Sequence, residues 1–166
     1  MLSQTIQNAL NDQVRNEIYS AHLYLAMAAY FEDSNWPGFA QWMRVQSREE
    51  TAHATKFFEY IIRRNGRAII QAIEQPPADF TSALDAFQQA LAHEQEVTRL
   101  ITALYSLAAK GNDTPTQIEL QWFVNEQVEE ERNAALIVEQ LKRVGDHSNA
   151  LFMLDHQLGK RGTTSS

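Results

Sequence analysis

Apolar residues recur along most of the chain at alternating steps of three and four, the spacing of amphipathic helices rather than of strands. Breaks rich in Asn, Pro or Gly separate four long stretches of this kind. They predict four long helices, over 3–32, from 37 to about 65, from 81 or 82 to 110, and 114–144. A shorter apolar stretch predicts a fifth helix over 148–158, and we expect a disordered polar tail over 159–166.

The connections between these helices differ in length, and this difference favours one topology. Short breaks follow the first and third helices, so each of them should pair antiparallel with the next. The break over 66–80 contains two prolines and is long enough to cross the bundle. Thr114 and Pro115 predict the cap and first turn of the fourth helix. We therefore expect one all-α domain over 1–166, an antiparallel four-helix bundle (3–145) with one long crossover between the second and third helices and a short fifth C-terminal helix.

Composition narrows the function. Fourteen Lys and Arg against twenty-one Asp and Glu give a net charge of -7, which argues against nucleic acid or an anionic membrane as partner and favours metal cations. The chain has no cysteine, so any metal must be held by oxygen and imidazole ligands. The N-terminus lacks the features of a signal peptide and no apolar run reaches about 18 residues, so we expect a cytoplasmic protein.

Ligand-type side chains interrupt the inner apolar seam of each predicted long helix, at its middle. The interruptions are Glu17 in the first helix, Glu50 and His53 in the second, Glu94 in the third, and Gln127 and Glu130 in the fourth. Elsewhere the seam of the second helix is predicted to include Gln46, and the seam of the third helix to include Leu84, Leu91, Thr98 and Tyr105.

The spacing of these residues repeats between the two halves of the chain. Glu17 and Glu50 are 33 residues apart, as are Glu94 and Gln127, and the two halves superpose with an offset of 77. At 1.5 Å of rise per residue, Glu17 and Glu94 each lie roughly 25 Å from the turn that follows. Antiparallel pairing should therefore bring all six side chains to one height in the bundle.

Burying several carboxylates together without compensation would cost several kcal/mol for each ion. A pair of bound cations is the simplest remedy, and a donor set of carboxylates with one imidazole suits iron or manganese, although zinc could also bind. The expected arrangement has bridging Glu50 and Glu130, a first ion completed by Glu17 and His53, a second completed by Glu94, and Gln127 as a weak ligand or a hydrogen-bond partner of bound oxygen.

The pattern resembles the ligand set of the bacterial non-haem ferritins over essentially the whole chain. The resemblance rests on Glu17, Tyr24, Glu49, Glu50, His53, Glu94, Glu126, Gln127, Glu129 and Glu130. It implies a di-iron ferroxidase centre of the six residues above, with Tyr24 as a redox-active neighbour. It also implies a third iron site formed by Glu49, Glu126 and Glu129, with Glu130 shared. Glu49 and Glu126 again differ by 77, which supports that site independently.

The resemblance also implies an activity and an assembly. We expect an iron-storage ferritin that oxidises Fe(II) with O2 or H2O2 and assembles into a shell of 24 subunits. The related bacterioferritins carry a second Glu-x-x-His where this chain has 127–130, and they hold haem through a Met where this chain has Thr51. No haem is therefore expected.

Three alternative protein classes fit the sequence less well than a storage ferritin. A rubrerythrin-like di-iron oxidase or peroxidase without storage is disfavoured because the chain has no cysteine for the usual electron-transfer module. A metal-free helical interaction module is disfavoured by the buried carboxylates. The small DNA-protecting ferritin cages place their iron sites between subunits, whereas this chain supplies a full set within one bundle.

Overall fold

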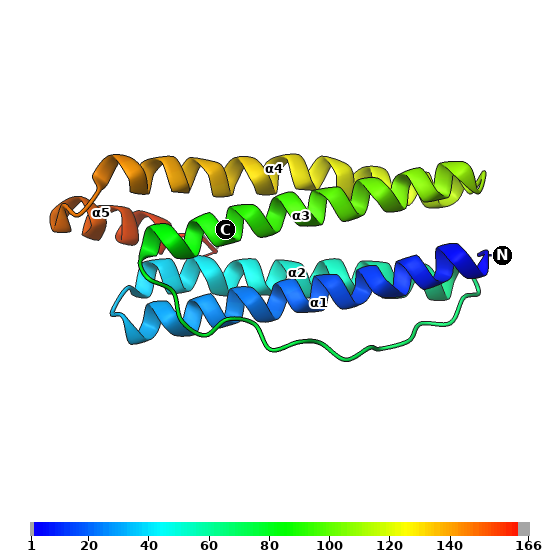
Figure 1. Cartoon of the computed structure of the whole chain (residues 1–166), viewed down its shortest axis with the longest axis horizontal. Coiled ribbons are helices and arrows are strands. Elements are labelled where there is room, and N and C mark those ends of the chain that lie inside the picture. Colours follow the sequence, from blue (N-terminus) through cyan, green and yellow to red (C-terminus); the bar gives the residue numbers. More distant parts are fainter. Residues whose placement is uncertain (1, 163–166) are drawn as a thin grey trace.

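Four long helices form an antiparallel bundle and a fifth packs across one end of it (Figure 1). The structure, a computed structural model, describes residues 2–162. The helices are α1 (Gln4–Asp33), α2 (Pro37–Arg63), α3 (Ala83–Lys110), α4 (Thr114–Val144) and α5 (Ser148–Leu158). The predicted all-α fold is confirmed, with its crossover between the second and third helices. Within the described residues, no helix is long and apolar enough to cross a membrane.

Side chains of the residues just before α1, α3 and α4 accept hydrogen bonds from the first backbone N–H groups of these helices. The Ser82 side chain accepts a hydrogen bond from the Asp85 N–H at 3.0 Å and caps α3, as the sequence predicts. The cap of α4 differs from the prediction, because Asp113 rather than Thr114 takes this position. Arg64 at the end of α2 holds the Asp113 carboxylate at 3.0 Å. Because Asp113 bonds to Arg64 as well, its carboxylate is favoured over the Thr114 hydroxyl as the cap of α4.

The crossover runs as an extended strap along the outside of α1 (Figure 1). Asn11, only 2% exposed, attaches it to the bundle. The Asn11 side chain donates to the Arg67 carbonyl at 3.0 Å and accepts from the Ile69 N–H at 2.7 Å. These two bonds satisfy backbone groups that have no helical partner, so the long connection is ordered.

Two apolar clusters fill the bundle, one on each side of its middle. The cluster nearer α5 contains Phe31, Phe39 and Phe87. The other contains Phe57 and Phe123, whose rings stack with their centroids 3.9 Å apart. The layer of buried polar side chains lies between these two clusters, and it contains the candidate site.

The inner face of α3 is rotated slightly from the predicted seam. Phe87, Glu94, Ile101 and Ala108 are buried as expected, but the residues between them are Ala90, Val97 and Leu104. The predicted seam residues Leu84, Leu91, Thr98 and Tyr105 are only half-buried. A spacing of three and four allows either set, and the small side chain of Ala90 lets α3 approach its neighbours closely.

The C-terminal helix is fixed against the start of α2. The Asp155 carboxylate accepts the Phe39 N–H at 2.8 Å. A Cβ on Gly38 would lie 1.8 Å from the Asp155 carbonyl oxygen, so this close approach requires glycine. The expected disorder of the 159–166 tail is wrong for residues 159–162, which form turns, and Arg161 in them contacts α2. Residues 163–166 lie outside the described part of the chain.

Candidate metal centre

The bundle brings the six predicted ligands into one buried layer. Each is on the inner face of its helix, with exposed fractions between 1% and 6%. Their common height follows from the repeated spacing of 33 residues around each short turn. The layer holds Glu17, Glu50, His53, Glu94, Gln127 and Glu130.

Glu17, Glu50 and His53 form the first cluster. One ligand atom from each lies within 4.8 Å of the others. His53 Nδ1 is 3.2 Å from Glu50 Oε2 and 3.9 Å from Glu17 Oε2. Gln13 donates to Glu17 Oε1 at 2.7 Å, but Glu17 Oε2 is buried without a hydrogen-bond partner among the described residues. A bound cation would satisfy this oxygen, so the donor set fits a metal ion.

His53, Glu126 and Glu130 form a second cluster, again within 4.8 Å. Gln46, which is fully buried, spans the two glutamates predicted to bridge the metals. Its amide nitrogen donates to Glu50 Oε1 at 3.1 Å and to Glu130 Oε2 at 2.7 Å. The seam spacing already placed Gln46 inside the bundle, but nothing in the sequence indicated that it links the two carboxylates.

Glu94 lies in the same layer but belongs to neither cluster among the described residues. The Tyr24 hydroxyl donates to Glu94 Oε1. The Gln127 amide nitrogen donates to Glu94 Oε2 at 3.1 Å and to Thr98 Oγ1 at 3.3 Å. Both carboxylate oxygens are therefore hydrogen-bonded, and Gln127 acts here as a donor to Glu94.

Burial and mutual repulsion keep several of these carboxyl groups protonated near neutral pH. Burial, and then the charge of Glu50, raise the pKa of Glu94 to about 8 and the pKa of Glu17 well above its usual value. Burial is also the main cause that raises the pKa of Glu130 to about 7. Any cation that binds must displace these protons.

Glu50 is the exception among the buried carboxyl groups. Burial opposes its ionisation, but the hydrogen bond and charge of His53 lower the pKa of Glu50. Burial likewise opposes protonation of His53, whereas the hydrogen bond to Glu50 raises the pKa of His53. The two form an ionised pair at the centre of the layer. Burial, and next the Glu94 carboxylate, raise the pKa of Tyr24.

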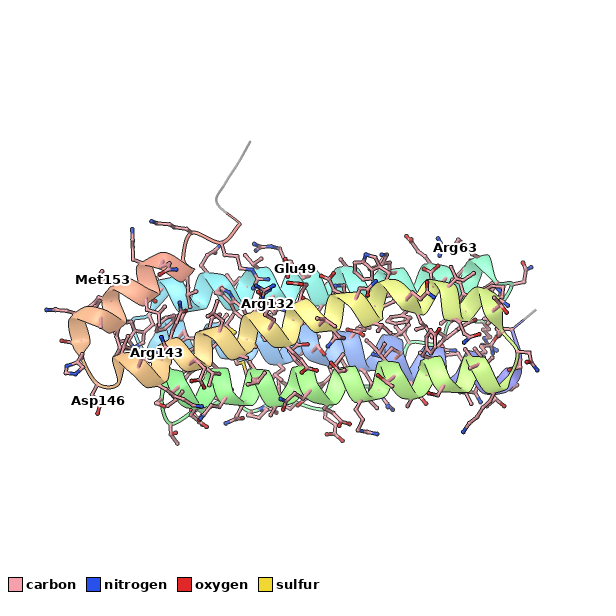
Figure 2. The ribbon with its side chains drawn as sticks, turned by 90° about the horizontal axis from the view of Figure 1, so that it is seen from above. Glu49, Arg63, Arg132, Arg143, Asp146 and Met153 are labelled. Carbon is pink, nitrogen blue, oxygen red and sulfur yellow. The ribbon has the colours of Figure 1, made fainter. Side chains whose placement is uncertain are left out.

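The three remaining predicted ligands are placed unequally. Glu126 is half-buried and joins the second cluster. Glu129 is exposed, and its carboxylate is 3.9 Å from Arg132. Glu49 is bound by Arg161 at 2.6 Å. Figure 2 shows that Glu49 and Arg132, the partner of Glu129, lie at the same level of the bundle. In the described residues the third-site glutamates thus do not converge on one point.

His93 is a neighbour of the layer that the sequence analysis missed. Its Nε2 lies 2.7 Å from Ser20 Oγ, and its ring meets the Tyr24 ring edge-on with centroids 6.4 Å apart. Burial lowers the pKa of His93. A single histidine off the predicted seam carries no signal in the sequence, so only the packing identifies it as a support for Tyr24.

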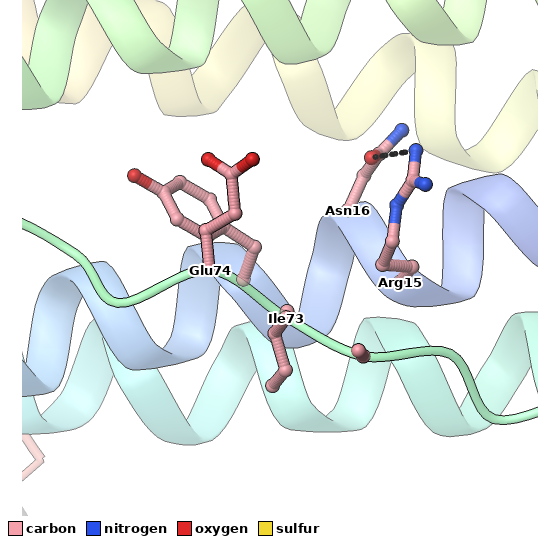
Figure 3. Close-up of a pocket in the computed structure, with 6 residues that line it drawn as sticks. Arg15, Asn16, Ile73 and Glu74 are labelled. Carbon is pink, nitrogen blue, oxygen red and sulfur yellow. Dashed lines mark hydrogen bonds between the residues drawn. The ribbon is translucent and has the colours of Figure 1, made fainter.

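A surface pocket of about 330 Å³ lies outside this layer, between α1 and the crossover (Figure 3). Arg15, Asn16 and Glu74 contribute to its lining. Asn16 contacts Gln13 at 3.5 Å, and Gln13 donates to Glu17. The pocket is therefore connected to the carboxylate layer through side-chain amides but supplies none of its ligands.

Comparisons with known proteins cover nearly the whole chain. The family model of the ferritin-like domain matches residues 7–144. A bacterial non-heme ferritin of Bacteroides fragilis (strain 638R) is 44% identical over 161 residues, which are 97% of this chain and 100% of that protein. Another, from Staphylococcus aureus (strain USA300), is 42% identical with 97% of each chain covered.

Solved structures agree with these sequence relatives. An open pore ferritin from the hyperthermophilic archaeon Archaeoglobus fulgidus superposes with a TM-score of 0.96 at 45% identity, covering 97% of this chain and 99% of the other. An engineered closed form of that ferritin gives the same TM-score and identity, with 97% and 98% covered.

Proposed function

The chain belongs to the ferritin family of iron-storage proteins, and on that premise we propose that its buried carboxylate layer is a ferroxidase centre. The centre oxidises Fe(II), and Fe(III) passes to a ferric oxide core inside a shell of 24 subunits. The observation that carries the proposal is Glu17 Oε2, which is buried beside Glu50 and His53 and has no hydrogen-bond partner among the described residues. The relatives named as ferritins support the storage role and the cage.

The proposed reaction uses two Fe(II) ions as substrate at each centre. Two Fe(II) give one electron each to O2, which takes up two protons and leaves as H2O2; with peroxide as oxidant, the products are two Fe(III) and two waters. Glu17 and His53 hold one ion, Glu94 holds the other, and Glu50 and Glu130 lie between them. The protein fixes the distance between the ions, so that both electrons reach one oxidant.

The neighbouring side chains prepare this reaction. Gln46 holds Glu50 and Glu130 together through one amide nitrogen, which orients the two bridging carboxylates before iron arrives. Glu94 and Glu130 release protons when iron binds, and these protons are available to reduced oxygen. Gln127 serves as a hydrogen-bond partner that positions Glu94.

Tyr24 is proposed to supply a further electron, because its hydroxyl contacts Glu94 inside the layer. Its electron, together with three from Fe(II) at the centre and at the third site, makes the four that reduce O2 to two waters, and its hydroxyl proton passes to Glu94. A Tyr24→Phe variant should lose any tyrosyl radical signal during iron oxidation. A radical of unchanged yield in that variant would assign the electron to another residue.

Glu49, Glu126 and Glu129, with Glu130 shared, are proposed as a third site for iron in transit. Glu126 is already beside Glu130. Occupation requires Glu49 to leave Arg161 and Glu129 to turn inward. No haem takes part in the proposed function.

The experiment that tests this proposal is anaerobic addition of Fe(II), followed by exposure to O2 with absorbance and light scattering recorded. The proposal predicts rapid ferric absorbance at two or three irons per chain, in a cage-sized particle that continues to accept iron. Oxidation that stops there in a small oligomer would favour the oxidase alternative. No oxidation would favour the metal-free module.

Two variants test whether iron oxidation takes place in the buried carboxylate layer. Glu50→Ala should abolish rapid oxidation, because it removes the ionised carboxylate at the centre. Glu59→Ala, an exposed glutamate on the same helix, should oxidise iron as the wild type does. Wild-type rates in Glu50→Ala would refute the site.

A further inference from the structure

The C-terminal turn delivers a positive charge to the rim of the carboxylate layer. Asp155 and Gly38 fix the end of α5 against α2, and Gly159 packs against Gly38, where an added Cβ would lie 3.0 Å from the Gly38 Cα. The chain then turns back along α2. Arg161, the third residue after α5, reaches Glu49.

Arg161 is held in place by several contacts with α2. Its guanidinium carbon lies 4.4 Å from the centroid of the Trp42 ring. Nη1 is 3.5 Å from the Trp42 carbonyl, and the Arg161 carbonyl accepts from the Gln41 side chain at 3.3 Å. Only 23% of the Arg161 side chain is exposed. It is therefore a packed side chain rather than a free surface arginine.

The arginine bonds to Glu49, one of the four carboxylates of the proposed third site. Nη2 donates to Glu49 Oε2 at 2.6 Å, the length of a charge-assisted hydrogen bond. Burial raises the pKa of Glu49 and of Glu130, and the charge of Arg161 opposes this rise at both carboxyl groups. Arg161 thus binds a carboxylate that a third cation would need.

We propose that Arg161 is an internal competitor for the third metal site and sets the affinity of that site by binding Glu49. The inference rests on the proposed function, in which Glu49 helps to hold iron in transit. An incoming divalent cation must displace the guanidinium from Glu49 and work against its charge. The two buried clusters around Glu17 and Glu130 need no such displacement, so iron fills them before it reaches Glu49.

Binding of metal and binding of Arg161 to Glu49 exclude each other. Metal at the third site releases Arg161, and anything that lifts the C-terminal turn frees Glu49 for metal. The third ion is consequently held weakly, which suits iron on its way out of the centre. The same contact helps to hold residues 159–162 against α2.

The test is a calorimetric titration of Zn²⁺ into the metal-free assembled protein, because Zn²⁺ takes the same ligands without redox chemistry. The wild type should bind two ions tightly and a third more weakly. Arg161→Gln should tighten the third ion by about fivefold, the upper end measured for exposed ion pairs, and leave the first two unchanged. Arg161→Lys keeps the charge and should restore most of the weak affinity.

Two further variants isolate the contact. Arg63→Gln is the matched control, because Arg63 is also on α2 but lies far from Glu49 (Figure 2). Arg63 pairs with Glu119 at 3.0 Å, and its variant should bind Zn²⁺ as the wild type does. Adding Glu49→Gln to Arg161→Gln should abolish the gain, because the competition acts through this carboxylate.

The possible failures are distinguishable. If Arg161→Gln leaves the third affinity unchanged while Glu49→Gln abolishes the third ion, the competition is refuted and the third site stands. A gain that survives in the double variant also refutes it. If no variant binds a third ion, both the third site and the inference are wrong. The ferroxidase proposal is tested separately by the Glu50→Ala variant.

Discussion

The metal-free protein should lose stability as pH rises from about 4.5 to about 8, and Glu94 should contribute a measurable part of this loss beside Glu17 and Glu130. The folded Glu94 carboxyl keeps its proton up to a pKa of about 8, whereas an unfolded glutamate has a pKa of 4.5. The unfolded chain therefore binds fewer protons throughout this window. The stabilisation is fully present below pH 4.5 and is lost as pH passes through 8.

The magnitude follows from the two pKa values. The rise from 4.5 to about 8 corresponds to about 5 kcal/mol in the free energy of unfolding. Domains of this size have about 5–15 kcal/mol in total, so the effect is large enough to move a denaturation midpoint visibly. Glu94→Gln cannot ionise, so its stability should fall less steeply with pH than that of the wild type, while Glu17 and Glu130 keep the rest of the slope.

Guanidinium denaturation followed by helical circular dichroism at pH 5, 6, 7 and 8, with a chelator present, measures this effect. The slopes with pH are compared rather than absolute stabilities, because an amide nitrogen in place of Glu94 Oε2 would face the Gln127 donor. Glu96→Gln is the matched control, since Glu96 is an exposed residue of α3 and its contact with Arg99 lowers its pKa. If Glu94→Gln keeps the wild-type slope, Glu94 is ionised in the folded protein and the reasoning fails.

Three other perturbations test the fold and the centre. Gly38→Ala should lift α5 from α2, because its Cβ would overlap the Asp155 carbonyl; faster proteolytic cleavage within α5 than in the wild type measures this, and equal rates would contradict it. Phe57→Ala should lower the free energy of unfolding by about 3–5 kcal/mol, since it removes the ring stacked on Phe123; a loss under 1 kcal/mol in chemical denaturation would count against that packing. Zn²⁺ binding should weaken below pH 7 by about tenfold per pH unit for each proton displaced, because Glu130 has a pKa of about 7; calorimetry in buffers of different ionisation enthalpy counts the protons, and a pH-independent affinity would show that none is released.

The long-range repeat in the sequence predicted most of the fold and the composition of the buried layer. Helix periodicity and one long loop determine the order of the bundle, and equal spacings around the two short turns determine the common height. Both depend on backbone geometry alone. Glu17, Glu50 and Glu94 are therefore buried where the sequence places them.

The contacts that the sequence did not predict depend on side chains from distant segments. Asn11 ties down the crossover across 56 residues or more, and Arg161 meets Glu49 across 112. The face of α3 is ambiguous in sequence because two sets of positions share Glu94, and packing beside the small Ala90 decides between them. Gln46 was on the predicted seam, but its double hydrogen bond exists only once α2 and α4 meet.

The donors around the carboxylates explain how the bundle can fold without metal. A layer of buried glutamates conflicts with the apolar core on either side, and such local conflicts mark functional sites. Here the conflict is reduced in advance, because Gln46, Gln127 and Tyr24 donate to three of the carboxylates. The raised pKa values of Glu17, Glu94 and Glu130 also favour their protonated forms. Only Glu17 Oε2 and the Gln46 carbonyl oxygen are left without a partner among the buried side-chain atoms of the described residues. A structural metal would be needed continuously, whereas carboxyl groups that can hold protons in place of cations suit the proposed function, in which iron is bound, oxidised and released. That property is the one required where the metal is the substrate.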